Sequence, residues 1–262
     1  WNGCIIRQNR FEKESTGWDI RGKRMDSKQE AKRQYMTTAP VRGLVLRMAV
    51  PTIISMLITN IYNMADTFFV GKLGTSATAA VGVVFPLMSV IQTFGFFFGH
   101  GSGNYISRAM GSQKMEDAEQ MAVTGFGSSF LFGVILMILG LLFQDPLARL
   151  LGSTDTILPY AKEYLCVILL GAPFMASSLT LNNQLRFQGS AFFGMIGITT
   201  GGILNIFLDP LFIFVLDMGI SGAAWATIIS QMISFLILLM MTRAGGNIRI
   251  RLSIFYAHYA NY

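Results

Sequence analysis

The chain has 262 residues, of which 52% are hydrophobic and only 13% are charged. Average soluble domains carry roughly 25% charged residues, so this composition excludes an ordinary soluble domain and indicates a membrane protein. The two cysteines, Cys4 and Cys166, lie far apart and fit no metal-binding spacing. We therefore expect no disulfide, no thiolate metal site and no cofactor.

Residues 1–43 form a polar, basic segment that lacks the apolar core of a cleavable signal peptide. The chain starts at Trp1, whereas Met25 opens a stretch typical of a cytoplasmic N-terminus, so residues 1–24 are expected not to be native. The tail, 252–262, is also atypical, and the chain is expected to be a fragment. Neither end is expected to pack on the rest, because burial there cannot offset the entropy of ordering.

Six apolar segments lie between these ends, each close to the ~20 residues that a helix needs to cross a ~30 Å hydrocarbon layer. The strict alternation of ~10-residue β-barrel strands is absent. The sequence therefore predicts an all-α, polytopic membrane protein with a six-helix lobe over 44–251. The expected helices are 44–70, 79–106, 119–143, 158–184, 191–216 and 222–242.

Lysine and arginine are distributed unevenly between the two sides of these segments. Seventeen of the 20 basic residues fall on the side of the N-terminal segment, and only Lys72, Arg149 and Lys162 map to the other side. By the positive-inside rule, both ends of this chain lie in the cytoplasm. The net charge of +6 is thereby explained by topology, so nucleic acid is not an expected partner.

Polar side chains from three predicted helices fall at a similar depth in the outer half of the membrane. At a rise of about 1.5 Å per residue, Asp66 lies about 8 Å, Asp209 about 12 Å and Thr227 about 9 Å from the outer ends of their helices. A single buried Asn or Thr often only joins two helices. Two aspartates at one depth predict a functional site, because intramembrane charge is costly and rare.

Amides accompany both carboxylates. Asn205 lies one turn before Asp209, and Asn63 lies three residues before Asp66, so each pair shares a helix face. Carboxylate, amide and hydroxyl oxygens suit Na⁺ or a proton, and repulsion between two nearby carboxylates favours uptake of a proton. Pro210 cannot donate to the carbonyl four residues earlier, which is left free to bend away or to act as a ligand.

Two further patterns have structural interpretations. Pro51 lies on the same predicted helix as Asp66, so either a hinge that moves a cavity wall or a static kink is expected there. Gly95, Gly99 and Gly103 recur at four-residue spacing without the preceding strand of a phosphate-binding loop. Close helix packing is the expected role of these glycines.

With these residues in view, the chain resembles the multidrug and toxic compound extrusion (MATE) family of cation-coupled efflux transporters. The resemblance covers roughly 44–251. It is carried by the stretches RMAVPTIISMLITNIYNMADTFFVGKLG, ISRAMGSQKMEDAE, LNNQLRFQG and LNIFLDPLFIFVLDMGISGAAWATIIS. Such transporters have twelve helices in two lobes, so the resemblance implies the N-terminal lobe of a transporter that needs a C-terminal lobe to work.

The resemblance also implies a function and a site. It implies antiport that exports organic, often cationic, drugs across a bacterial inner membrane, with lipid as the surroundings and no enzymatic activity. It assigns the coupling of Na⁺ or H⁺ to Asp66, Asn205, Asp209 and Thr227. An amide of LNNQLR, Asn182 in preference to Asn183, is expected in a supporting polar cavity with Asn63, and Pro51 and Pro210 are the candidate hinges.

Other functions remain as alternatives. A lipid-linked saccharide flippase of the same superfamily would carry basic residues in its central cavity, and the first, second and fifth helices carry none in their interiors. An intramembrane aspartyl protease would need Tyr-Asp and Gly-x-Gly-Asp motifs, but Ala65 precedes Asp66 and Leu208 precedes Asp209. A non-transporting fragment is the third alternative.

Overall fold

The computed structural model describes residues 40–244. The chain divides into two compact units, Trp1–Ala49 and Val50–Tyr262, and the helix packing reported below is that of the second unit. The expectations for residues 1–24 and 252–262 lie outside the described residues.

Six long helices account for most of the described residues. They are α3 (Val41–Gly71), α4 (Thr75–Gly111), α5 (Met115–Leu142), α7 (Leu158–Phe187), α8 (Ala191–Pro210), which continues as the π-helical turn η1 (Leu211–Val215), and α9 (Gly219–Ala244). All six are long and apolar enough to cross a membrane, and residues 40–244 contain no strand. The predicted all-α fold with six membrane-length helices is confirmed. A short helix, α6 (Gln144–Leu150), was not predicted.

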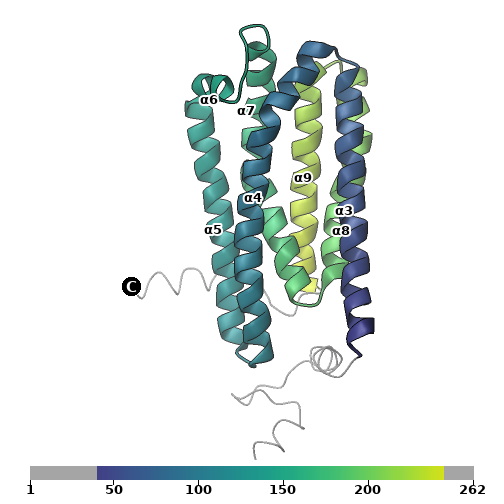
Figure 1. The fold of residues 1–262 in the computed structure, drawn as a ribbon, viewed down its shortest axis with the longest axis vertical. Coiled ribbons are helices and arrows are strands. Elements are labelled where there is room, and N and C mark those ends of the chain that lie inside the picture. The colour runs from purple at the N-terminus through teal and green to yellow at the C-terminus, as the bar shows by residue number, and fades with distance from the viewer. Residues whose placement is uncertain (1–39, 245–262) are drawn as a thin grey trace, which may run out of the picture. The chain divides into compact units, whose positions relative to one another are not determined.

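The central helix of the bundle is α7, which packs against α4, α5, α8 and α9 (Figure 1). Most of its residues are buried, and small residues let the neighbouring helices approach closely. A Cβ added to Gly133 of α5 would lie 2.5 Å from the Pro173 Cα of α7, and one added to Gly95 of α4 would lie 2.9 Å from the Ala176 carbonyl oxygen. The close packing predicted for the glycine series of α4 is confirmed.

Buried polar groups of α7 also join the helices. The Thr180 hydroxyl lies 2.8 Å from the Ser129 hydroxyl of α5 and 3.1 Å from the Gly95 carbonyl oxygen of α4. The Gln184 amide donates to the Ser102 hydroxyl of α4 at 3.0 Å. Such bonds align the helices in a medium that offers no water to compete for them.

The turn from α7 to α8 is set by a glycine. Gly189 has φ of 72°, in the left-handed region that a side chain disfavours. This conformation lets the Ser190 amide bond the Leu185 carbonyl at 2.9 Å, which closes the end of α7. As a result α8 returns beside α7 and runs parallel to α3 (Figure 1).

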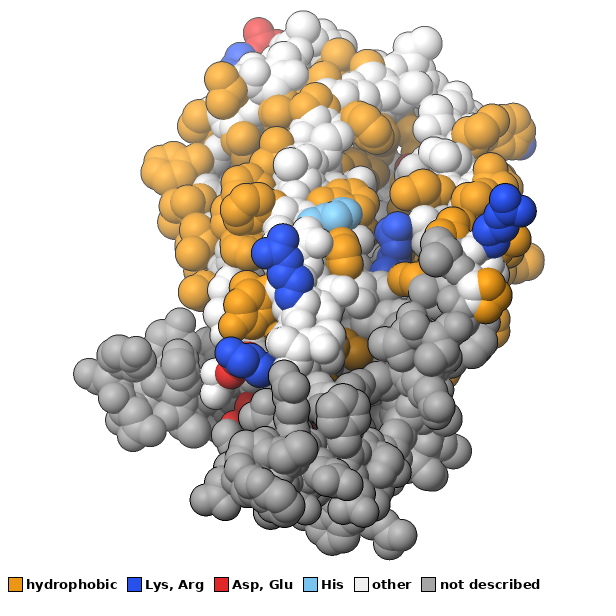
Figure 2. Space-filling view, turned by 60° about the horizontal axis from the view of Figure 1, so that its bottom comes forward, with side chains coloured by type: hydrophobic (Ala, Val, Ile, Leu, Met, Phe, Trp, Pro, Cys, Tyr) orange, Lys and Arg blue, Asp and Glu red, His pale blue; other side chains and the backbone are white. Residues whose placement is uncertain are grey.

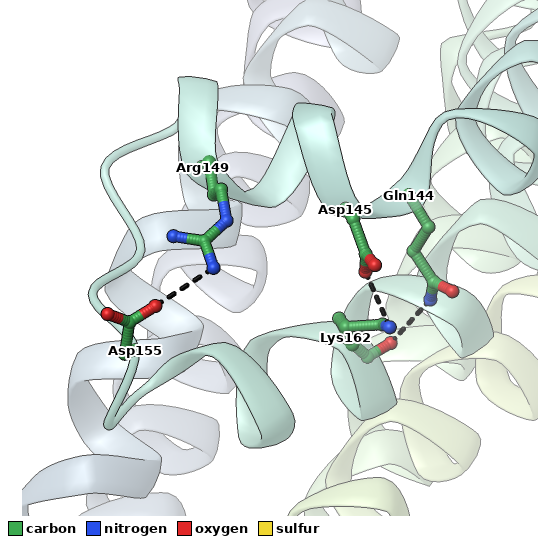
Figure 3. Close-up of polar contacts among 5 residues, drawn as sticks. All are labelled: Gln144, Asp145, Arg149, Asp155 and Lys162. Atoms are coloured by element: carbon green, nitrogen blue, oxygen red, sulfur yellow. Dashed lines mark hydrogen bonds and ion pairs between the residues drawn. The ribbon is translucent and has the colours of Figure 1, made fainter.

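Polar contacts hold α6 against the start of α7 (Figure 3). The Gln144 side chain donates to the Lys162 carbonyl at 2.7 Å, and the Lys162 ammonium pairs with Asp145. Arg149 pairs with Asp155 at 2.9 Å. These contacts anchor a helix whose seven residues are too few to be stable alone.

Arg149→Ala is expected to change the free energy of unfolding by less than ~1 kcal/mol, because exposed ion pairs are screened by water and both partners are exposed. Gln144→Ala is expected to cost about 1 kcal/mol, because it leaves a partly buried carbonyl without its donor. Denaturant unfolding of the two variants in detergent checks this order. A larger loss for Arg149→Ala would contradict it.

Candidate functional site

The end of α8 presents two of the predicted site residues to the bundle interior. Asn205 and Asp209 are 2% and 0% exposed. Pro210 follows at once and has no N–H to continue the α-helical ladder. After Pro210 the chain forms the wider π-helical turn η1, in which the Leu216 amide donates to the Leu211 carbonyl, five residues earlier, at 2.9 Å. Turns of this kind are rare and are frequent at functional sites.

Hydrogen bonds bring Asn205, Asp209 and Thr227 together. The Asn205 amide nitrogen donates to Asp209 Oδ1 at 3.1 Å and to Thr227 Oγ1 of α9 at 3.4 Å. The Thr227 hydroxyl donates in turn to the Ala223 carbonyl at 3.0 Å. The donors of these three side chains are thereby used, and only acceptor capacity is left over.

The acceptors that remain are carboxylate and amide oxygens. Asp209 Oδ2, Asn205 Oδ1 and Asp66 Oδ1 are buried and have no hydrogen-bond partner among the described residues. Buried acceptors without donors are costly and rare. Oxygen atoms that lack donors can bind a hard monovalent cation, and a carboxylate can also bind a proton. We name the side chains of Asp66, Asn205, Asp209 and Thr227 the oxygen cluster.

Asp66 reaches this cluster from α3, which runs parallel to α8 (Figure 1) and approaches it near Gly202. Gly202 has no side chain, so Tyr62 of α3 comes close: a Cβ on Gly202 would lie 3.0 Å from the Tyr62 ring. One turn further along each helix lie Asp66 and Asn205. The Asp66 carboxylate is partly buried and interacts electrostatically with Asp209.

Tyr164 is a member of the site that the sequence interpretation missed. It lies on α7, is 0% exposed, and its hydroxyl has no hydrogen-bond partner among the described residues. It interacts electrostatically with both Asp66 and Asp209. Tyr164 comes six residues after Leu158, the first residue of α7, so the same rise would have placed it about 9 Å deep, level with Thr227.

Of the two residues predicted in a supporting polar cavity, Asn182 lines a cavity and Asn63 does not. Among the described residues, the Asn63 side chain makes no hydrogen bond to the oxygen cluster, and its carbonyl accepts the Thr67 hydroxyl at 2.9 Å. Asn182, which is 5% exposed, lines a separate cavity of about 230 Å³. Pro51 is a buried residue within α3, next to Thr52 in the wall of that cavity.

The fold and the buried oxygen cluster define a multi-pass helical membrane protein. The chain belongs to the MatE family, whose model matches residues 51–211.

The multidrug export protein MepA of Staphylococcus aureus (strain MRSA252) is 30% identical over 223 residues, which cover 84% of this chain and 49% of that protein. A crystal structure of MATE in the straight conformation superimposes with a TM-score of 0.76 at 32% identity, covering 80% of this chain and 47% of the other. A MOP superfamily transporter from Pyrococcus furiosus gives 0.75 at 32% identity, with 80% and 47% covered. The chain thus spans about half the length of the curated relatives it matches and corresponds to one lobe of the MATE structures.

Proposed function

We propose that this chain forms the N-terminal lobe of a cation-coupled antiporter that exports organic, often cationic, drugs and toxic compounds. The main support is the set of three buried oxygen atoms without donors on Asp66, Asn205 and Asp209. The similarity to a protein named for multidrug export supports the substrate class. Transport requires a C-terminal lobe, because the relatives are about twice as long as the matched part.

The oxygen cluster would supply the coupling. Na⁺ would take its ligands from the free oxygen atoms of Asp209, Asn205 and Asp66, whereas a proton would reside on one of the two carboxylates. Either cation offsets the repulsion between the carboxylates and removes the cost of their buried charge. Binding of the cation therefore stabilises whichever arrangement of α3 and α8 holds these oxygens together, and that difference in affinity can drive a conformational change.

The orientation follows from the distribution of charge. The end of α3 and the start of α7 lie at the end of the bundle that carries α6 (Figure 1). By their positions in the chain, Lys72 directly follows α3, Arg149 belongs to α6 and Lys162 to the first turns of α7. This end has few basic residues, so we place it on the outer face of a bacterial inner membrane, with both ends of the chain in the cytoplasm. The oxygen cluster then lies in the outer half of the membrane.

Transport in proteoliposomes tests this function. The chain is joined to the C-terminal lobe of a MepA relative, and the movement of ethidium, an organic cation, is followed under a Na⁺ gradient or a pH gradient. We expect ethidium to move against its own gradient under the Na⁺ gradient, the pH gradient or both. The gradient that drives this movement identifies the coupling cation. The chain without the second lobe is the control and is expected to move none. Ethidium movement that depends on neither gradient would refute coupled antiport.

A further inference from the structure

Asp66 differs from the other members of the oxygen cluster in the way it is held. Asn205, Asp209 and Thr227 are joined by hydrogen bonds within α8 and between α8 and α9. Among the described residues, Asp66 makes no hydrogen bond to any of these three side chains, and its Oδ1 atom has no partner. The position of the Asp66 carboxylate therefore depends on how α3 packs against the rest of the bundle.

The packing of α3 is sparse over most of its length. Between residues 50 and 71 of α3, only Pro51 and Val70 are buried. Val70 lies one turn beyond Asp66 and belongs to the same core cluster as Ile213 of η1. The buried contact nearest to Asp66 along α3 is therefore at the outer end of this helix.

Aromatic rings and a lysine join this end of α3 to η1. The Phe69 ring packs edge to face against Phe214, with the ring centroids 6.3 Å apart and an interplanar angle of 71°. The Lys72 ammonium lies 4.6 Å from the ring centroid of Phe68 and 6.0 Å from that of Phe214. Both arrangements are attractive for aromatic rings. We name Phe68, Phe69, Lys72 and Phe214 the aromatic clasp.

The η1 side of the clasp is fixed against α9. A Cβ added to Gly222 of α9 would lie 2.8 Å from the Phe212 carbonyl oxygen, so a residue without a side chain is needed for this close approach. The Met218 amide donates to the same carbonyl at 3.1 Å. Phe214 is thus carried on a braced turn, and the sparsely packed α3 docks on it.

The clasp lies next to the carboxylates along both helices. Phe69 comes three residues after Asp66, and Phe214 comes five residues after Asp209, so each ring is about one turn beyond its carboxylate. Contact between the rings holds α3 and η1 together at this level, and loss of the contact frees Asp66 to move away from Asp209. No member of the clasp lines the cavity that contains Asn182.

We propose that the aromatic clasp positions Asp66 for cation binding. Phe69, Lys72 and Phe214 hold the outer end of α3 on η1, so that the Asp66 carboxylate stays beside the hydrogen-bonded part of the oxygen cluster. Loss of the clasp lowers the affinity of the cluster for the coupling cation without removing any ligand. This inference rests on the proposed function in taking the oxygen cluster as the cation site.

A role in contact with lipid makes a different prediction. Figure 2 shows hydrophobic side chains over much of the described surface on that face, so an exposed phenylalanine is ordinary on this bundle, and lysine side chains commonly reach for the membrane surface. If Phe214 served only as a lipid contact, its removal would affect insertion and leave the cation affinity of the inserted protein unchanged. Phe143 is the matched control, because it is exposed, directly precedes α6 at the same end of the bundle and makes no ring contact among the described residues.

Infrared titration of the full chain in nanodiscs tests the proposal. The measured quantity is the concentration of Na⁺ or H⁺ that half-changes the C=O band of a protonated, buried carboxyl group. Phe214→Ala is expected to raise this concentration roughly 3- to 10-fold, the factor that one aromatic pair contributes. Phe214→Tyr, which keeps the ring, and Phe143→Ala are expected to match the wild type.

Lys72 provides a second test that does not depend on a buried side chain. Lys72 is exposed, so Lys72→Gln is expected to fold even if Phe214→Ala does not. It is expected to raise the half-change concentration by roughly 2- to 5-fold, the factor that one exposed cation–π contact contributes. Lys72→Arg keeps a cation over the rings and is expected to match the wild type.

The Asp66→Asn background shows whether the clasp acts through Asp66. In that background Phe214→Ala is expected to add no further change, because the carboxylate that the clasp positions is already gone. Wild-type cation affinity in folded Phe214→Ala and Lys72→Gln, or the same increase with and without Asp66, would overturn the proposal while leaving coupled export intact. A wild-type band that changes with neither cation would instead refute the proposed function, and this inference with it.

Discussion

Asp209→Asn is expected to abolish cation-coupled export by the chain joined to a C-terminal lobe, while the protein still folds and inserts. Asn has nearly the same volume and can hydrogen-bond Asn205, whose amide lies 3.1 Å from Asp209 Oδ1. It cannot ionise, so the cluster loses the charge that attracts Na⁺ and one of the two groups that take up a proton. Drug accumulation in cells with equal amounts of each protein measures the effect.

The matched control is Asp217→Asn. Asp217 is exposed and has φ of 51°, a backbone conformation that Asn tolerates well. Export is expected to be unchanged, because this side chain lies outside the oxygen cluster. If Asp209 were only a protonated hydrogen-bond donor, Asn would replace it well. In that case, cells with Asp209→Asn would keep drug out as well as wild-type cells do, across several Na⁺ concentrations and pH values.

Gly133→Ala is expected to produce the largest loss of stability from the addition of one methyl group. The new Cβ would lie 2.5 Å from Pro173 Cα and 2.9 Å from Pro173 N. Both are backbone atoms of the central helix α7 and cannot rotate away, so α5 and α7 must separate. Overpacking of this kind costs about 1–3 kcal/mol, and denaturant unfolding in detergent measures it.

Gly101→Ala is the same substitution in open space. Gly101 lies on an exposed part of α4, and a Cβ there would meet nothing within 4 Å. Alanine favours the helix over glycine by about 0.5–1 kcal/mol, so this variant is expected to be slightly more stable than wild type. Equal free energies of unfolding for the two variants would contradict the close contact between α5 and α7.

The meeting of Asn205, Asp209 and Thr227 could be predicted because helical rise gives polar groups on different helices a similar depth, and the cost of buried charge favours bringing them together. Helical rise gives Tyr164 the same depth but does not assign it to the site, because a tyrosine in an apolar stretch is indistinguishable from an ordinary core residue until its hydroxyl is seen without a partner.

Other features depend on packing that no local pattern encodes. Pro210 predicted a free carbonyl, but not the π-helical turn η1 that follows it. α6 is too short for its apolar residues to show a period. In the sequence, Arg186 served only as one of the basic residues that mark the cytoplasmic side. Its place in a cavity wall follows from the way α8 folds back beside α7.

Infrared difference spectroscopy on the purified chain in nanodiscs tests most directly whether the oxygen cluster takes up a cation. We expect the C=O band of a protonated, buried carboxyl group at low pH. This band should be lost as the pH is raised and, if Na⁺ couples, also when Na⁺ is added at constant pH, because the ion and the proton compete for the same oxygens. Asp209→Asn should lack this response, and Asp217→Asn should keep it. A wild-type carboxyl band that changes with neither pH nor Na⁺ would contradict cation uptake by the oxygen cluster.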